Sequence, residues 1–307
     1  MADPRYFVCS DNHKIAYRIW LPDNSKTPSA FLQILHGMAE HGSRYERFAK
    51  FLNKNGIAVF CHDQRGHGDT ASDDEKGWFA EKDGWMRIAR DAYELANYIS
   101  SEYSSPRMFL MGHSMGSFLA RTMMILYPNF YCGIIAMGTG SSQGIAGKVG
   151  KMIAKHEIKK NGSKTPSELL NKLSFSSYNK KFEPTKTAFD WLSCDSLEVE
   201  KYVRDSDCGF VCSCGLFYDM IQGIEFANNK EKAERLPKDL PILLISGEQD
   251  PVGKFSKGVH KVYELYKAAG IADLSLKLIP EARHEILNEV SRKDTSEYIM
   301  DWISIRI

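Results

Sequence analysis

The chain has 307 residues, 43% of them hydrophobic, which is enough for one large core or for one core with a small accessory domain. Its 40 basic and 39 acidic residues leave a formal net charge of +1, so no overall electrostatic field favours nucleic acid or anionic lipid. The composition therefore predicts no nucleic-acid partner, and other partners have to be inferred from individual sites.

The cysteines and the N-terminal residues bear on the cellular compartment. Seven cysteines, an odd number, are scattered from Cys9 to Cys214 in a chain large enough to fold without disulfides, which is typical of reduced thiols. The first residues, "MADPRYFVCSDNHK", lack the pattern of a signal peptide, and no stretch approaches the roughly 20 apolar residues of a membrane helix. These features predict a cytoplasmic protein.

The first elements form a hairpin and a buried strand. The runs "RYFVCS" and "KIAYRIW" flank the turn "DNH", and the second run alternates apolar and polar residues as a half-buried strand does. "AFLQILH" (30–36) is nearly continuous in apolar residues, which is typical of a parallel strand covered on both faces. Ser43 and Glu46 then predict a capping box for the helix "RYERFAKFLNKN", and Gly56 is expected to end it.

Strand and helix patterns alternate along the rest of the core. They cover 57–63, 84–103, 107–112, 117–127, 132–138, 240–246 and 274–279. Strands separated by helices imply a mostly parallel sheet with helices on both faces, so the antiparallel hairpin belongs at one edge. The sequence therefore predicts an α/β fold with eight strands.

The alternation fails between 139 and 238. Amphipathic helical segments such as "PSELLNKL" and "GLFYDMIQGIEFA" take over there, and the stretch is rich in aromatic residues and leucine. We expect residues 1–138 and 239–307 to form the core, and residues 139–238 to form a helical cap inserted after the sixth strand. Such a cap could also touch a membrane transiently, and the oligomeric state is not predicted.

The segment "FLMGHSMGSFLAR" joins a predicted strand to a predicted helix, with Gly112, Ser114 and Gly116 at the junction. This G-x-S-x-G spacing is the one that lets a serine project from a sharp strand-to-helix turn. By itself the motif arises by chance often enough to be weak. A hydroxyl is a poor nucleophile, so the hypothesis that Ser114 reacts requires a base and donors for an oxyanion.

Two downstream residues can complete a triad with Ser114. His284, in "LKLIPEARHEIL", and Asp250, in "ILLISGEQDPVG", each follow a predicted strand, where reacting groups gather in an open α/β sheet. A carboxylate at Asp250 would orient the imidazole of His284 and stabilise its protonated form. Asp250 could alternatively only cap the turn before Pro251, and Glu248 is the competing acid.

An oxyanion formed at Ser114 would be met by two backbone N–H groups, one from the residue after the nucleophile and one from the loop after the third strand. These are Met115 and Met38. The loop "LHGMAEHG" suits the second role, because Gly37 allows the main chain to approach a ligand closely.

Five segments together resemble one protein family. "HGMAEHGSRY", "DQRGHGDT", "GHSMGS", "GEQDPVG" and "RHEILNE", in this order across nearly the whole chain, resemble the monoacylglycerol lipase and lysophospholipase branch of the α/β-hydrolases, within the serine aminopeptidase S33 (hydrolase-4) group. The resemblance implies the α/β-hydrolase fold and a serine esterase that cleaves an acyl ester of a single-chain lipid through an acyl-enzyme, without a cofactor. It carries the roles given above to Ser114, Asp250, His284, Met38 and Met115.

Two other functions are compatible with the same core. A proline-releasing aminopeptidase would need acidic cap residues to hold a free α-amino group, and Glu198, Glu200, Asp205 and Asp207 are available. A non-catalytic binding protein would keep the pocket without a working triad.

The remaining motifs favour structural interpretations. "CGFVCSC" (208–214), with Cys194 upstream, lacks common zinc-ligand spacings, so no metal is predicted, and "MGTGSSQG" lacks a dinucleotide fingerprint. We expect His36 and His113 to bond within the scaffold, and His62 and His67 to lie in a structural loop. Within the same regions we expect two ion pairs, Asp63 with Arg65 and Glu40 with Arg44, the latter at the surface.

Overall fold

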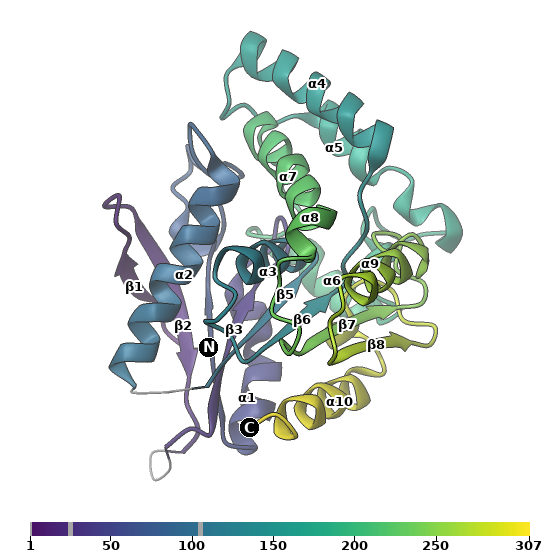
Figure 1. Ribbon diagram of the computed structural model, residues 1–307. Coiled ribbons are helices and arrows are strands. Elements are labelled where there is room, and N and C mark those ends of the chain that lie inside the picture. The colour runs from purple at the N-terminus through teal and green to yellow at the C-terminus, as the bar shows by residue number, and fades with distance from the viewer. Residues whose placement is uncertain (1, 24–26, 104–106) are drawn as a thin grey trace.

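The computed structural model describes residues 2–23, 27–103 and 107–307, and within them eight strands form one sheet (Figure 1). The strand order is β1-β2-β4-β3-β5-β6-β7-β8. The strands are β1 (Arg5–Val8), β2 (Lys14–Trp20), β3 (Ala30–Leu35), β4 (Ile57–His62), β5 (Met108–His113), β6 (Gly133–Met137), β7 (Ile242–Gly247) and β8 (Leu274–Ile279). The predicted number of strands is confirmed.

Strand direction follows the predicted pattern. β1 pairs antiparallel with β2, and β2 pairs antiparallel with β4, whereas the remaining neighbours from β4 to β8 are parallel. The hairpin therefore lies at one edge of the sheet. The central strands β3, β4, β5, β6 and β7 are buried along their whole length, which explains their continuous apolar sequence.

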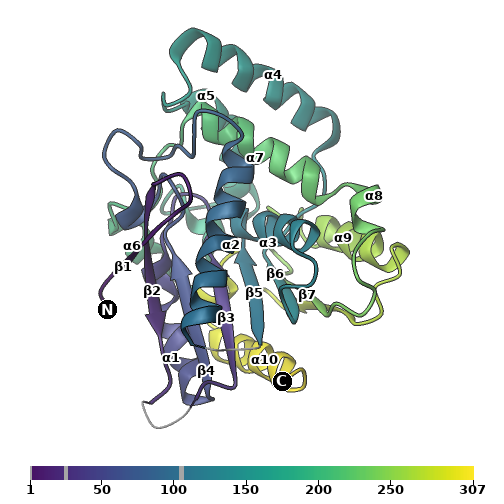
Figure 2. The ribbon, with the colours of Figure 1, turned by 60° about the vertical axis from the view of Figure 1, so that its left-hand side comes forward.

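Helices cover both faces of the sheet (Figure 2). Successive side chains of a strand point to opposite faces, so Leu110 packs in one hydrophobic core and Met111 in the other. The first core includes α2 (Gly84–Glu102), α3 (Met115–Leu126) and α9 (Lys257–Ala268). The second includes α1 (Glu46–Lys54) and α10 (Arg292–Ser304).

The segment between β6 and β7 is helical, and we call residues 139–238 the cap. It contains α4 (Gly144–Asn161), α5 (Glu168–Phe175), α6 (Ser196–Arg204), α7 (Cys214–Ala227) and α8 (Lys230–Ala233). α7 packs on α2 and α3 of the core and on α4 of the cap. Both views place α4 at the outer end of the molecule, far from α1 and α10.

The predicted capping box at Ser43 and Glu46 is wrong. A 3₁₀ turn, η1 (Gly42–Tyr45), precedes α1, so Tyr45 occupies the N-cap position and no side chain caps the helix. The hydroxyl of Ser43 instead contacts Nδ1 of His41 at 2.8 Å. The other end is as predicted, because Gly56 has a φ of 81°.

The predicted ion pair between Asp63 and Arg65 is also wrong. Asp63 follows β4 and accepts from Arg18 on the neighbouring strand β2 at 3.1 Å. Arg65 turns the other way and binds Asp91 of α2 at 2.6 Å and Asp11 at 2.8 Å. Both residues therefore form ion pairs with neighbouring elements of the fold, and not with each other.

No helix in the described parts of the chain is long and apolar enough to cross a membrane. The prediction of a cytoplasmic location goes beyond this finding and stays a prediction.

Candidate active site

The turn at Ser114 joins β5 directly to α3 and is conformationally strained. Ser114 has a φ of 52° and a ψ of −118°, a region that residues with a side chain rarely adopt. A Cβ added at Gly112 would lie 1.9 Å from the carbonyl oxygen of Gly116, and a Cβ added at Gly116 would lie 2.1 Å from that of Leu35. Glycine is therefore required on both sides of Ser114, because any side chain there would keep α3 from approaching β5 and β3 this closely.

The loops that follow β7 and β8 bring Asp250 and His284 together. Nδ1 of His284 lies 2.9 Å from Oδ1 of Asp250, although the ring is not aligned for a good hydrogen bond, and both side chains are buried. Asp250 is held in place because its carboxylate accepts from Val252 N at 2.8 Å and from Ser246 Oγ at 3.1 Å. Nε2 of His284 has no partner among the described residues. Glu248, the competing acid, is exposed.

A cavity of about 450 Å³ separates the core from the cap, and Ser114 and His284 both line it. Its cap side is mainly aromatic and aliphatic. The apolar cap residues are Phe175, Tyr178, Phe189, Trp191, Leu192, Phe210 and Met220. The polar cap residues Glu168, Asn171, Lys172, Ser176 and Asn179 also contribute. This volume lies within the range of small-molecule pockets.

The loop after β3 runs beside Ser114. A Cβ added at Gly37 would lie only 3.3 Å from Cβ of Ser114, so the absence of a side chain allows this approach. Met38 lines the cavity, whereas Met115 is fully buried at the start of α3. In the described part of the chain, neither backbone N–H of these two methionines is used in a hydrogen bond. Both N–H groups therefore remain available to a ligand.

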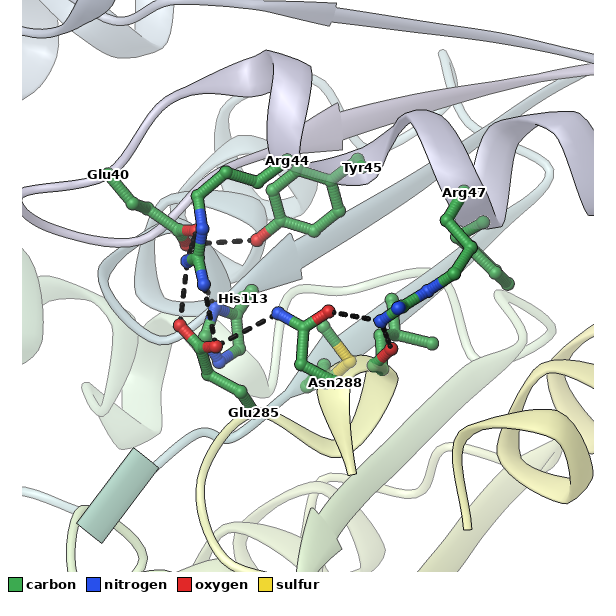
Figure 3. Close-up of a pocket in the computed structure, with 10 residues that line it drawn as sticks. Glu40, Arg44, Tyr45, Arg47, His113, Glu285 and Asn288 are labelled. Atoms are coloured by element: carbon green, nitrogen blue, oxygen red, sulfur yellow. Dashed lines mark hydrogen bonds and ion pairs between the residues drawn. The ribbon is translucent and has the colours of Figure 1, made fainter. Parts of the chain in front are cut away.

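Glu40 organises this loop through a buried cluster of charges, shown in Figure 3. Its Oε1 accepts from Gly37 N at 2.5 Å and from the Tyr45 hydroxyl at 3.0 Å. Its Oε2 accepts from Arg44 at 2.5 Å, and Arg44 also binds both oxygens of Glu285 at 2.7 Å. The predicted pair of Glu40 with Arg44 exists, but it is buried, not at the surface.

His113 links the same cluster to His284. Its Nδ1 lies 3.0 Å from Oε1 of Glu40, and its ring centre lies 4.7 Å from that of His284. Burial alone would lower the pKa of His113, but the hydrogen bond and the negative charge of Glu40 raise it overall. Burial alone would raise the pKa of Glu40, but Arg44 and His113 hold that pKa well below its usual range. His113 therefore belongs to the scaffold, as the sequence predicted.

The other three histidines expected in the scaffold also lie there. His36 is buried, with Nδ1 at 2.7 Å from the carbonyl oxygen of Gly37 and Nε2 accepting from Gln64 N at 2.9 Å. His62, which was expected in a loop, instead ends β4 and is fully buried. His67 is buried in the following loop, and its Nε2 accepts from Ala39 N at 3.1 Å.

One part of the cap, residues 190–195, is bonded directly to the loop that carries His284. The Trp191 ring centre lies 5.1 Å from that of His284, and Glu285 N donates to the carbonyl oxygen of Leu192 at 2.7 Å. The carboxylate of Glu289 accepts from Cys194 N at 3.1 Å and from Arg283 N at 2.7 Å. These contacts fix the imidazole from the cap side.

Sequence reasoning missed several of these contacts. Glu285 and Glu289 lie within the segment "RHEILNE", but nothing in their spacing shows that they bond to Arg44 and to Cys194. The aromatic content of the cap was the only available signal for Trp191, and it does not identify which residue meets His284.

Several known proteins are similar to this chain over nearly its whole length. Monoglyceride lipase of Homo sapiens is 28% identical over 308 residues, covering 99% of this chain and 91% of that protein. The structure of a thermostable carboxyl esterase from Bacillus coagulans in complex with glycerol is 29% identical, has a TM-score of 0.91 and covers 100% of both chains. A soluble variant of monoglyceride lipase from Saccharomyces cerevisiae, 20% identical with a TM-score of 0.78 and coverage of 99% and 96%, shares the fold.

The family model described as serine aminopeptidase, S33, matches residues 26–291, which include both the core and the cap. The match, the sheet and the structural neighbours agree with the resemblance seen in the sequence. The chain therefore belongs to the serine aminopeptidase S33 family and has the α/β-hydrolase fold.

Proposed function

We propose that this protein is a serine carboxylic ester hydrolase that acts on acyl lipids of the monoacylglycerol or lysophospholipid type. One observation carries the proposal: the strained Ser114 shares a cavity with His284, whose Nδ1 lies 2.9 Å from Asp250. The esterase and lipase names of the relatives support a carboxylic ester hydrolase.

The proposed chemistry follows from the positions of these groups. Oγ of Ser114 attacks the ester carbonyl carbon while Nε2 of His284 takes the hydroxyl proton, and Asp250 stabilises the resulting imidazolium. The N–H groups of Met38 and Met115 donate to the oxyanion. His284 then protonates the departing alcohol, which leaves an acyl-enzyme at Ser114. Water, deprotonated by the same imidazole, releases the fatty acid and restores the serine.

The lining of the cavity supports an acyl substrate. An alkyl chain loses water when it lies against Phe175, Phe210 and Met220, and each buried methylene contributes about 0.8 kcal/mol to binding. We therefore expect faster turnover of medium and long acyl chains than of acetate. We also propose that residues 139–238 act as a cap domain on a core of residues 1–138 and 239–307.

The aminopeptidase alternative receives less support from the geometry. Glu198 pairs with Arg47, and Glu200 pairs with Arg204. Asp205 contacts His41. None of these acids, nor Asp207, is among the described residues that line the cavity. Glu168 does line it and could hold an amino group, so both substrate classes should be tested.

Two measurements test the proposal. Labelling with a fluorophosphonate should modify Ser114 in the native protein and fail in Ser114→Ala, whereas a non-catalytic binding protein would react slowly or not at all. A panel of p-nitrophenyl esters should be hydrolysed, with proline amides left intact. Rapid amide cleavage without ester turnover would reject the esterase in favour of the aminopeptidase.

A further inference from the structure

Three potential metal ligands from distant segments meet outside the cavity. His41 comes from the loop after β3, whereas Asp205 and Cys208 come from the turn after α6 in the cap. Nε2 of His41 lies 2.9 Å from Oδ2 of Asp205, and one ligand atom from each of His41, Asp205 and Cys208 lies within 4.8 Å of the other two. The sequence could not reveal this group, because the cysteine spacing in "CGFVCSC" carries no information about His41.

Further hydrogen bonds orient the side chains of His41 and Asp205 toward each other. Nδ1 of His41 contacts the Ser43 hydroxyl at 2.8 Å, so Nε2 is the nitrogen that faces Asp205. Oδ1 of Asp205 accepts from Asp207 N at 3.0 Å, which leaves Oδ2 facing His41. Histidine ligands of metals commonly use their second nitrogen, and ligating carboxylates their second oxygen, in such outer contacts. The turn is closed by Cys208 N, which donates to the carbonyl oxygen of Asp205 at 3.0 Å.

Access also suits a cation. Both signs of charge lie near the Cys208 sulfur: burial raises the pKa of its thiol, the Arg44 guanidinium lowers that pKa, and the carboxylates of Glu40, Asp205 and Glu285 raise it. The Asp205 side chain is 35% exposed, which gives an ion an entry path, whereas Cys208 is buried.

We propose that His41, Asp205 and Cys208 bind one Zn²⁺ ion or a similar divalent cation, with water as a fourth ligand. Imidazole nitrogen, carboxylate oxygen and thiolate are all zinc ligands, and an open fourth position is common. On binding, the ion displaces the thiol proton of Cys208 to solvent and replaces the direct contact between His41 and Asp205.

The ion would tie the cap to the loop that carries Met38. The carbonyl oxygen of Ala39 already accepts from Gly209 N and from the Tyr202 hydroxyl, each at 2.9 Å. The proposed ligands lie next to these contacts, with His41 two residues after Ala39 and Cys208 immediately before Gly209. Binding to the folded state alone would also raise the melting temperature.

A second group of potential ligands, Cys9, Asp91 and Glu94, is less suited to a cation. Its carboxylates are already bound by guanidinium groups, Asp91 by Arg65 and Arg87, and Glu94 by Arg87. It therefore serves as the internal competitor in the experiment.

Titration of the full chain with Co²⁺, followed by absorption, tests the site. The expected result is one bound Co²⁺ per chain with a thiolate-to-cobalt charge-transfer band, displaced by Zn²⁺. Cys208→Ser should abolish the band, and Asp205→Asn should weaken binding roughly tenfold or more. Cys194→Ser, which changes an exposed cysteine outside the site, should keep the band.

Thermal unfolding provides a second measurement that does not depend on enzyme activity. Zn²⁺ should raise the melting temperature of the native protein and of Cys194→Ser, but not that of Asp205→Asn, a partly exposed substitution that the fold should tolerate. A native protein that binds no Co²⁺ overturns the proposal. So does a charge-transfer band that persists in Cys208→Ser, which would assign the metal to another cysteine.

Discussion

The two walls of the cavity are built on different principles. The core wall, formed by Gly37 to Glu40, His113, Ser114 and His284, consists of polar groups fixed by buried contacts such as those of Glu40. The cap wall consists largely of rings that meet other rings, as where Phe175 stacks on Trp191 with centroids 6.1 Å apart. A polar contact depends on atomic positions, whereas ring packing depends mainly on filled volume. We infer that the core wall sets the chemistry and the cap wall sets which acyl chains bind.

The largest effect is expected at the core wall. Ser114→Ala and His284→Ala should each lower kcat by several orders of magnitude, roughly 10⁴-fold or more, because the members of a triad act as a unit. Steady-state kinetics on a p-nitrophenyl ester gives the measurement. Ser72→Ala, at an exposed serine that does not line the cavity, is the matched control, and its kcat should equal that of the native protein. Substantial activity in either triad variant would contradict the assignment.

A smaller loss is expected when the support of the core wall is changed. Glu40→Gln keeps the shape but removes the charge that faces Arg44 and His113. The loop at Gly37 should loosen, and kcat should fall about 10-fold to 100-fold with little change in KM, since an oxyanion donor is misplaced. Glu46→Gln, at the partly buried start of α1 where Glu46 pairs with Lys50, is the control. An increase in KM alone would show that Glu40 acts on binding and not on the transition state.

Acid should destabilise the core through two buried histidines outside the cavity lining, His62 and His67. Burial lowers the pKa of His62 to about 4 and that of His67 to about 3, compared with 6.5 for a free side chain. The unfolded chain takes up these protons below pH 6.5 and the folded chain does not, so stability present above pH 6.5 is lost toward pH 4. For His62 the loss is on the order of 3 kcal/mol.

Calorimetric melting between pH 6.5 and pH 4 measures this loss. His62→Phe should flatten the pH dependence, because both ring nitrogens of His62 lack partners among the described residues and an apolar ring cannot titrate. His156→Gln, on the exposed side of α4, should retain the native slope. His113, whose pKa is raised, acts in the opposite direction in all three proteins. Equal slopes in the native protein and His62→Phe would refute the assignment.

The smallest effect is expected at the cap wall. Phe210→Ala should raise KM for long-chain esters roughly threefold to tenfold, with kcat for short esters nearly unchanged, because it removes apolar contact but no polar group that touches the ester. Phe226→Ala, also in the cap but outside the lining, is the control. A large fall in kcat for short esters would erase the distinction between the two walls.

Local sequence patterns predicted much of the structure of the core and little of that of the cap. The glycines around Ser114 are required by close backbone contacts, that of Gly112 within the turn and that of Gly116 with Leu35 of β3, and the motif itself was sufficient to predict the turn. The capping box failed because His41 competes for the Ser43 hydroxyl, and Asp63 pairs with Arg18 because β2 lies beside β4. Such partners are set by tertiary packing. For the same reason, no pattern in the sequence indicates that Trp191 meets His284.

The bonds between residues 190–195 and the histidine loop give the enzyme a direction. Because Leu192, Cys194 and Trp191 hold the loop of His284, the cap cannot lift at this corner without dragging the imidazole away from Asp250. We expect a substrate to be admitted along another part of the cap, such as α5, which lines the cavity with Asn171 and Lys172. In the proposed function, a lipid would pass α5 with its acyl chain first until its ester reaches Ser114.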